Sequence, residues 1–358
     1  MASYEKFLQV GIALDPVHVG TGGARIGRVD LTVVRDPVTQ VPKIPGSSLA
    51  GVYRTYVAMH EEENRQQQIQ QASQSGQQTQ VRQKPFYPDC AGLGLDQSRG
   101  HCRQPDCPVC TVFGFARGAG QEGGFAGLAA FTDAHVLLFP VPTRQGPMWV
   151  TSPVMLEMIG LTVNGVDDSA VYVENPGNPL NLGWLLLEAR QCNQMSDVKQ
   201  HLKKLGIPDY IQNRLAMVPD RLFAHIVNSN LEVRTSVSIK PETGAAEEGA
   251  LFSYEALPRG TVLVWEIIAK NPVHFKVAGQ DIKVTLNNEE QMNAPEKVHQ
   301  VAQRAHPYLE YLGIGGMGTR GMGRLQVLHS ASTSASQSAQ GTPTASGQPA
   351  SSTTQGRG

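Results

Sequence analysis

An α+β fold with antiparallel strand pairing is the architecture that the sequence predicts. Apolar segments of strand length near the N-terminus, in the middle and near the C-terminus are separated by segments with helical periodicity, an order typical of this class. Apolar residues make up 40% of the 358 residues, which is enough for a sizeable core. This length fits one large domain with insertions or two modest domains, because domains most often have about 100–150 residues.

Apolar periodicity places the individual strands and helices. Strands are expected at Phe7–Leu14, Leu128–Phe139, Leu231–Ile239, Val262–Ala269 and Leu325–Leu328. Helices are expected from Ser47 or Ser48 onward, at Ser196–Leu205 and at Asn288–Ala305. The first helix should bury an apolar stripe against a sheet; its members are Leu49, Val52, Tyr53, Tyr56 and Val57.

Two segments lack the apolar residues needed for packing. Residues 61–85 are rich in Gln and are expected to form a flexible insertion, because they cannot bury enough surface to offset the entropy of ordering. Residues 330–358 consist almost entirely of Ser, Thr, Gly, Gln, Ala and Pro, which predicts a disordered C-terminal tail. The folded domain is therefore expected within residues 1–329.

Charge and cysteine content bear on partners and location. The formal net charge is −1, so any nucleic-acid-binding face must be local. No apolar run reaches the roughly 18 residues of a membrane span, and Met1–Val10 lacks the regions of a signal peptide. We therefore expect a cytoplasmic protein without membrane partners, in which the five cysteines stay reduced and clustered ones bind metal rather than form disulfides.

A glycine-rich loop near the N-terminus has the composition of a phosphate-binding loop. It begins with His18–Gly23, and its glycines let the backbone approach a polyanion closely. Arg25, Arg28 and Arg35 add positive charge nearby. Asp30 can hold a divalent ion beside bound phosphate. It can also pair with Arg28, so a structural turn with a surface ion pair is the alternative.

A second candidate phosphate site lies at the start of the first predicted helix, in Lys43–Ser48. A helix N-terminus carries partial positive charge and unpaired N–H groups, and Lys43 adds a full charge. Ser47 or Ser48 can instead act as an ordinary helix cap. Both interpretations stay open on the sequence alone.

Clustered cysteines predict a metal site in residues 90–110. Cys107 and Cys110 have the two-residue spacing that suits one zinc ion, and Cys102 lies close to them. Either Cys90 or His101 would complete four tetrahedral ligands. Reduced thiols without metal are the alternative, but they leave the clustering unexplained. We expect a structural zinc knuckle rather than a catalytic site, because Pro and Arg residues flank the cysteines.

A glycine-rich segment near the C-terminus, Gly313–Arg324, is predicted to form an RNA-binding loop. Its many glycines cannot form a stable helix. An RNA backbone can lie against exposed amides of such a loop, and the residues expected to contribute are Gly315, Gly316, Arg320, Gly321 and Arg324. A flexible linker is the alternative, but linkers are usually rich in Ser and lack the Met and Ile residues found here.

Together these motifs resemble the RAMP superfamily of CRISPR proteins, in particular the repeated backbone subunit of Cmr-type (type III-B) effector complexes. The resemblance covers most of residues 1–328 in the right order, through Leu14–Asp30, Ile44–Arg54, Phe131–Pro153, Gly249–Pro258 and Gly313–Arg324. Within them, Ala134–Val141 followed by Met148–Pro153 is similar to that subunit's central strand and turn. Glu248–Phe252 followed by Glu255–Pro258 is characteristic of it.

The resemblance implies both a fold and partners. It implies an RRM-like (ferredoxin-like) core in one RAMP domain, with a β-hairpin thumb at about residues 228–248 and the Cys-rich loop as an insertion. Copies of the chain would stack along a CRISPR RNA (crRNA) into a filament with other type III effector subunits. Each thumb would fold over the duplex of guide and target RNA.

The resemblance also implies a reaction. Asp30 occupies the place of a family aspartate that is required for cleavage of target RNA, and His18 matches a family histidine near the same loop. The reaction would be metal-dependent cleavage by an endoribonuclease, with Mg²⁺ expected. The 2′-OH of the substrate would attack once the thumb bends the backbone into line, while Asp30 positions a divalent ion or this hydroxyl.

Contacts to crRNA follow from the same resemblance. Ser47 and Ser48 match the start of a crRNA-contacting helix, and Gly315–Gly323 matches the family's glycine-rich RNA-binding loop. The family commonly has lysine at the position of Ala50, so one contact to a crRNA phosphate is either missing here or replaced by Arg54.

Three alternatives stay open at this point. The chain can be a structural backbone subunit that binds RNA without cutting it. It can be a crRNA-processing endonuclease of the same superfamily, although the usual catalytic histidine context is not evident. It can also be a Csm-type homologue, since the Cys-rich loop is more typical of Csm-type and fused type III effectors.

Overall fold

The computed structural model describes residues 2–22, 29–75, 82–92, 100–116, 123–167, 169–247, 249–286 and 290–328. Its strands are β1 (Tyr4–Ala13), β2 (Lys43–Ile44), β3 (Ala129–Phe131), β4 (Ala134–Val141), β5 (Met148–Thr151), β6 (Ala170–Val173), β7 (Leu180–Leu182), β8 (Leu185–Gln191), β9 (Leu215–Met217), β10 (Glu232–Ser236), β11 (Phe252–Ala256), β12 (Val262–Lys270), β13 (Lys276–Val277), β14 (Gln280–Asp281) and β15 (Leu325–Leu328).

Helices alternate irregularly with these strands. They are α1 (Gly46–Ser75), α2 (Pro108–Phe113), α3 (Pro153–Glu157), α4 (Met195–Lys204), α5 (Asp209–Gln212), α6 (Asp220–Ser229), α7 (Pro295–Gln303) and α8 (His306–Tyr311), with 3₁₀ turns η1 (Asp89–Ala91), η2 (Pro272–His274) and η3 (Gly318–Arg320). None of the described helices combines the length and the apolar character needed to cross a bilayer.

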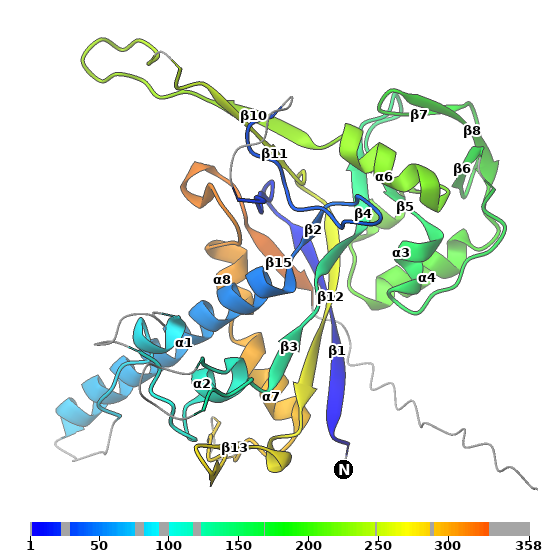
Figure 1. Cartoon of the computed structure of the whole chain (residues 1–358). Coiled ribbons are helices and arrows are strands. Elements are labelled where there is room, and N and C mark those ends of the chain that lie inside the picture. Colours follow the sequence, from blue (N-terminus) through cyan, green and yellow to red (C-terminus); the bar gives the residue numbers. More distant parts are fainter. Residues whose placement is uncertain are drawn as a thin grey trace, which may run out of the picture.

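A large mixed sheet organises the molecule (Figure 1). Its strand order is β15–β1–β12–β4–β5–β9–β6–β8–β7, with β2 added to β4 and β3 to β12. Pairing from β15 to β5 is antiparallel, whereas β5 pairs with β9 and β6 with β8 in parallel. The predicted α+β class with antiparallel pairing is confirmed for the central strands.

Strand β1 lies between β15 and β12, and the burial of both its faces explains its weak apolar alternation. It pairs with β12 from Tyr4↔Lys270 to Ile12↔Val262, and its last residues also pair with β15. Every residue from Gln9 to Ala13 is buried, so both faces of this half of the strand are covered. Helices α1, α7 and α8 pack against the central strands and lie on the same side of them in Figure 1.

The start of α1 differs from the sequence prediction. The helix begins at Gly46, so Ser47 and Ser48 lie inside its first turn rather than at the cap position. The Gly46 N–H donates to Oδ1 of Asp133 at 2.8 Å, and this carboxylate lies between β3 and β4. A side chain distant in sequence therefore caps α1, and the local serine motif did not reveal it. The predicted stripe is confirmed, with Leu49, Tyr53 and Val57 fully buried.

The end of α1 is a second difference. The helix continues to Ser75, so the predicted flexible insertion is wrong over residues 61–75. Gln, Glu and Arg are good helix formers, and the side chains supply partners. Glu62 accepts a hydrogen bond from Arg65 at 2.6 Å and one from the Phe86 N–H at 2.9 Å, and Glu61 pairs with Arg304. Residues 76–81 of the insertion and the predicted tail at 330–358 lie outside the described residues.

A lobe built from β5–β9 and α3–α6 occupies the upper right of Figure 1. Of its elements, the sequence predicted only α4, which is confirmed within one residue at each end. Strands β6, β7 and β9 have three or four residues each, and most of these residues are buried. Such short, buried strands show no alternation, because neither of their faces meets solvent.

Two other predicted elements have different boundaries in the structure. The strand predicted at Leu128–Phe139 is divided into β3 and β4 at Thr132–Asp133, and the helix predicted at Asn288–Ala305 begins only at Pro295. Strand β10 pairs with β11, from Glu232↔Ala256 to Ser236↔Phe252. This hairpin, residues 232–256, is called the thumb below. Its distal part extends away from the body in Figure 1. It ends later than the predicted residues 228–248, of which Asn228 and Ser229 belong to α6.

Candidate nucleic-acid interface and metal centre

Three segments distant in sequence meet at the base of the thumb: the loop after β1, strand β11 and the glycine-rich loop. They share a small apolar cluster formed by Tyr254, Ala256 and Met322, with Leu31, Phe252 and Met317 packed on it. The Leu31 N–H donates to the Ser253 carbonyl at 3.1 Å, and the Leu31 carbonyl accepts from the Glu255 N–H at 3.0 Å. The first loop is thus aligned along β11 by backbone hydrogen bonds.

Asp30 lies at this junction with an exposed side chain. Its Oδ2 accepts hydrogen bonds from the Ser253 N–H at 2.7 Å and from the Ser253 hydroxyl at 2.9 Å. The backbone hydrogen bond, followed by that of the hydroxyl, lowers the pKa of Asp30 below its usual value. The carboxylate therefore stays ionised at neutral pH. This favours cation binding or the orientation of a hydroxyl over proton abstraction, because an effective general base has a pKa near the working pH.

His18 lies in the same junction but is buried, with 5% of its surface exposed. Its Nδ1 is 2.5 Å from the Glu255 carbonyl, which can only accept, so Nδ1 carries the proton. Its ring meets the Tyr254 ring edge-on with 5.9 Å between centroids. Its own carbonyl accepts from the Gly316 N–H at 2.9 Å. These contacts tie the three segments together and disfavour the predicted role in proton transfer.

A groove of about 390 Å³ brings two of the sequence motifs together. Ser47, Ser48 and Thr55 of α1 line one side, and Ile314 and Gly315 of the glycine-rich loop line the other. The hydroxyl of Tyr56, which also lines the groove, donates to the Gly313 carbonyl at 2.6 Å. Ser47 and Ser48 therefore line a groove without capping the helix, and their contact with a ligand stays a prediction.

Close packing of the main chain explains several glycines of the C-terminal loop. A Cβ on Gly315, whose φ is +89°, would lie 2.3 Å from the His18 carbonyl oxygen. A Cβ on Gly313 would lie 2.6 Å from the main chain at the far end of the same loop. The Gly316 amide is already bonded to His18. The prediction of exposed amides therefore needs correction at Gly316, whereas Gly321 is exposed with open space around it.

The two arginines of this loop point to different neighbours. The Arg320 guanidinium lies over the Phe252 ring of the thumb, 5.6 Å from its centroid. The Arg324 Nε donates to Oδ2 of Asp15 at 2.6 Å. Arg320 is thus held at the thumb base, while the charge of Arg324 is partly offset by a carboxylate.

The other predicted cations near the first loop are engaged by acidic side chains where the structure describes them. Lys43 pairs with Asp133 at 2.6 Å and with Asp36 at 3.5 Å, which disfavours it as a phosphate ligand. Arg35 pairs with Glu255 at 2.9 Å, so it braces the loop against β11. Arg25 and Arg28, and with them the predicted Arg28–Asp30 ion pair, lie outside the described residues.

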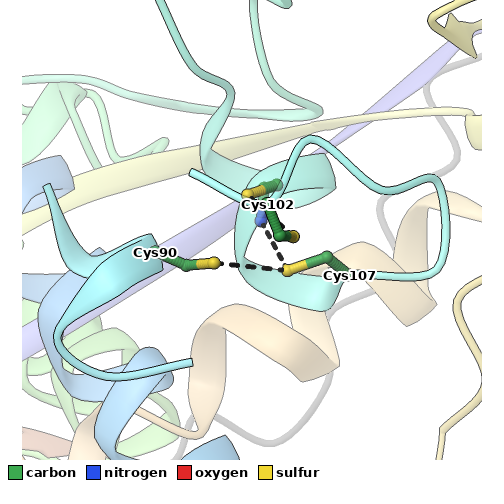
Figure 2. A group of neighbouring side chains, drawn as sticks. Cys90, Cys102 and Cys107 are labelled. Carbon is green, nitrogen blue, oxygen red and sulfur yellow. Dashed lines mark hydrogen bonds between the residues drawn. The ribbon is translucent and has the colours of Figure 1, made fainter. Parts of the chain in front are cut away.

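Four cysteines converge on one point beside α1 (Figure 2). Cys90 lies in η1, Cys102 in the loop before α2, Cys107 at the start of α2 and Cys110 within it. Their sulfurs lie within 4.8 Å of one another, with 3.6 Å between Cys102 and Cys110 and 4.0 Å between Cys90 and Cys107. Tetrahedral zinc with Zn–S bonds of about 2.3 Å requires sulfurs about 3.8 Å apart. The cluster therefore fits a metal ion.

The closeness of four ionisable thiols also favours a bound metal ion. Burial, followed by contacts with the other sulfurs, raises the pKa of the Cys107 thiol, whereas hydrogen bonds from Cys107 and Cys110 lower that of Cys102. Four sulfurs this close cannot all be ionised unless a cation lies between them. The structure also selects between the alternatives for the fourth ligand, because Cys90, and not His101, belongs to the group.

Arg54 is corrected from a predicted RNA contact to a neighbour of the cysteine cluster. Its Nε donates to the Cys90 carbonyl at 3.2 Å, and its Nη2 donates to the Gly114 carbonyl. The side chain is half-buried beside the sulfurs rather than directed toward the groove. It therefore does not replace the missing lysine at Ala50.

Residues 252–255 are the part of the junction that sequence reasoning left unassigned. Ser253 and Glu255 hold Asp30, His18 and Arg35, and Phe252 receives Arg320. The signal was present, since this segment belongs to the Gly249–Pro258 motif. Only its pairing along the first loop reveals what its side chains contact.

The fold and the motifs define a class of protein. The RAMP superfamily matches residues 12–326, and the chain belongs to this superfamily. It is 26% identical over 288 residues to the CRISPR system Cmr endoribonuclease Cmr4 of Pyrococcus furiosus, covering 75% of this chain and 82% of that protein. A shorter stretch of 61 residues is 44% identical to the CRISPR system Cms endoribonuclease Csm3 of Enterococcus italicus, covering 16% of this chain and 28% of that protein.

Solved structures share the fold. A chain in the cryo-EM structure of the type III-B Cmr-beta complex bound to cognate target RNA superposes with a TM-score of 0.57 at 16% identity, over 91% of this chain and 98% of that one. The crystal structure of oligomeric Cmr4 from Pyrococcus furiosus superposes with a TM-score of 0.51 at 18% identity, over 91% of this chain and 98% of that one.

Proposed function

We propose that this protein is a crRNA-binding backbone subunit of a type III-B CRISPR effector complex and that it cleaves complementary target RNA. Its partners are crRNA, target RNA, further copies of itself and the other subunits of the complex. Membership of the RAMP superfamily and the similarity to Cmr4 support this assignment. The observation that carries the cleavage activity is the ionised, exposed carboxylate of Asp30, held by Ser253 where three motif-bearing segments meet.

The proposal includes an RRM-like core. Strands β1, β4, β12 and β15 follow one another along the chain, and their order in the sheet is β15–β1–β12–β4 with every neighbour antiparallel. Along the chain, α1 comes between β1 and β4, and α7 and α8 come between β12 and β15. This arrangement supports a ferredoxin-like core, to which the lobe, the thumb and the Cys-rich loop are added as insertions within one domain.

The crRNA backbone would follow the groove between α1 and the glycine-rich loop. Ser47 and Ser48 line the groove from the first turn of α1, where their hydroxyls can donate to phosphate and the partial positive charge of the helix N-terminus favours an anion. Arg320 and Gly321 would extend this surface toward the thumb. The local net charge need not be high, because the filament repeats the contact in every copy.

In the proposed reaction, the 2′-OH of the target attacks the adjacent phosphate while Asp30 orients this hydroxyl or holds a divalent ion. The bond from phosphorus to the 5′-oxygen of the next nucleotide breaks and that oxygen takes up a proton, so the products are a 2′,3′-cyclic phosphate and a 5′-hydroxyl. Among the described residues, no group of three or more metal-ligating side chains includes Asp30. An ion at Asp30 would therefore take its other ligands from RNA phosphates and water, as Mg²⁺ commonly does. Such an ion, when bound, would neutralise charge on the reacting phosphate.

We further propose that the four-cysteine cluster holds a structural zinc ion. All four ligands come from protein, and three of the cysteines are fully buried, which is typical of a structural site without an open position. All five cysteines are unpaired in the structure, which is compatible with the cytoplasmic location predicted from the sequence.

A second candidate function is a backbone subunit that binds RNA without cutting it. The observation favouring it is that Oδ2 of Asp30 already accepts two hydrogen bonds from the thumb, so the residue has a structural use as well. The local similarity to Csm3 keeps a Csm-type assignment as the alternative subtype.

Replacement of Asp30 by alanine in the reconstituted complex tests cleavage. We expect loss of target cleavage, with assembly on crRNA and target binding retained, because those depend on many contacts elsewhere. The wild-type complex should cut at regular intervals, stop with EDTA and recover with Mg²⁺. Asp281→Ala, on an exposed carboxylate of β14, is the matched control and should cut like wild type.

The outcomes separate the candidates. An unchanged cleavage ladder with Asp30→Ala would place the active site elsewhere. A wild-type complex that binds target RNA and never cuts it would establish the structural subunit. Cleavage that persists in EDTA would leave Asp30 to orient the hydroxyl without a metal ion.

A further inference from the structure

Two arginines from different segments of the chain lie near the cysteine cluster. Arg54 comes from α1 and donates to the carbonyls of Cys90 and Gly114. Cys90 supplies one sulfur, and Gly114 ends the short helix that carries Cys110. Arg54 therefore joins the two pieces of chain that carry these sulfurs, as well as placing a positive charge beside them.

Arg82 approaches from the segment that precedes η1. Its guanidinium lies over the Phe86 ring, 4.4 Å from the centroid, and its Nε donates to the Lys84 carbonyl at 3.0 Å. Its guanidinium reaches the loop that carries Cys102 and Cys107, at Asp106, which directly precedes Cys107. Asp106 lies 3.9 Å from this guanidinium, but its side chain is 62% exposed, so solvent screens much of the attraction between the two.

The two arginines can balance the negative charge of a zinc ion held by four thiolates. A zinc ion with four thiolates carries a net charge of −2, and Cys90, Cys107 and Cys110 are fully buried. A buried net charge is costly unless opposite charges lie next to it. Two guanidinium groups supply +2, which balances the cluster.

We propose that Arg54 and Arg82 neutralise the zinc–tetrathiolate cluster and thereby determine how tightly this chain retains its metal. The inference rests on the zinc site proposed above. Neither arginine is a zinc ligand; each acts through the sulfurs as a positioning and charge-balancing residue. Partners of this kind in other metal sites change metal affinity by about 10–100-fold.

The test uses the purified full-length chain loaded with zinc and its variants Arg54→Gln and Arg82→Gln. Zinc affinity is measured by competition with a chromophoric chelator, and coordination is read from the thiolate-to-metal absorption after substitution with cobalt(II). We expect each variant to bind zinc about 10–100-fold more weakly while keeping the tetrathiolate spectrum. Arg82→Lys should recover most of the affinity, because it restores the charge.

Control variants distinguish a failure of this inference from a failure of the proposed zinc site. Arg144→Gln removes an exposed arginine in the turn between β4 and β5 and should bind zinc like wild type. Cys107→Ser should lose the metal. If wild type binds zinc and both arginine variants match Arg144→Gln, the charge-balance inference is wrong and the zinc site stands. If wild type binds no zinc, the zinc proposal fails first, and the inference fails with it. If Arg54→Gln does not fold, the Arg82 pair of variants decides the result.

Discussion

At the scale of single residues, Asp133 shows how one carboxylate serves two elements. Its Oδ1 accepts from the Gly46 N–H at the start of α1, and its Oδ2 lies 2.6 Å from Nζ of Lys43 on β2. The same residue thus caps the helix whose first turn lines the groove and removes Lys43 from the predicted phosphate site. Neither contact is visible in the sequence near Ser47.

Replacement of Asp133 by alanine should therefore lower the free energy of unfolding by about 1–2 kcal/mol, the usual cost of losing a helix cap and leaving a cation without its partner. Urea unfolding of the full chain measures this difference. Asp133→Asn keeps an acceptor for Gly46 and should lose less. Asp281→Ala, whose side chain is 79% exposed, is the control and should change stability little. Equal effects of Asp133→Ala and Asp281→Ala would contradict the capping role.

The difference in stability between wild type and Asp133→Ala should also depend on pH, and the pKa shift of Asp133 gives the direction of this dependence. Burial works against ionisation of Asp133, but hydrogen bonds from Lys43 and Gly46 outweigh it and lower its pKa. Its contribution is therefore complete above the unfolded pKa of about 3.9 and is lost as pH falls through the folded pKa. The stability difference between wild type and Asp133→Ala should be constant from about pH 7 to about pH 5 and shrink below about pH 4. A difference that grows on acidification would exclude this assignment.

At the scale of elements, the thumb divides into a fixed base and a distal arm. The base is held by Tyr254 in the small apolar cluster and by Glu255, which contacts Arg35. The distal arm carries exposed apolar side chains, including Val237, Ile239 and Leu251. Little apolar surface is buried there, so the arm should contribute little to the stability of the fold.

Replacement of Val237–Leu251 by a short turn that joins Ser236 to Phe252 tests this division. The melting temperature should change by no more than about 2 °C, because the pairs of β10 and β11 and the contacts of the base remain. In the proposed complex, crRNA binding should survive and target cleavage should fall. A loss of many degrees would show that the arm packs on the body. A control that only lengthens the turn at Thr243–Gly244 should leave both stability and cleavage unchanged.

At the scale of the whole molecule, α1 connects the two candidate sites. Its first turn lines the groove, its Arg54 contacts the cysteine cluster, and its buried stripe packs on the central strands. Its extension to Ser75 is stabilised by the pair of Glu61 and Arg304, which joins it to the end of α7. The cysteine cluster and the groove are therefore positioned by the same helix and the same core.

The segment beyond β15 should be dispensable to this core. Deletion of Ala331–Gly358 is expected to leave both the melting temperature and RNA binding nearly unchanged, since the segment has too few apolar residues to pack. Thermal unfolding and crRNA binding of the shortened and full chains make the comparison. A fall of many degrees on truncation would show that the segment docks on the domain.

Strong local patterns were sufficient to predict part of this protein from its sequence. The stripe of α1, strands β12 and β15, helix α4 and the cysteine cluster each carry a periodicity or a spacing within a few turns of chain. The RAMP motifs added the family and the proposed position of Asp30. These features depend on residues that are neighbours in sequence, so one sequence contains their full signal.

Other features were decided only by tertiary structure, because their partners are far apart in the chain. Asp133 caps a helix that begins at Gly46, Ser253 holds Asp30, and Arg54 turns to the cysteines instead of RNA. The lobe strands are too short and too buried to alternate, so only their pairing identifies them. Side-chain contacts across long stretches of sequence are chosen by how the sheet brings segments together, and no local pattern encodes that choice.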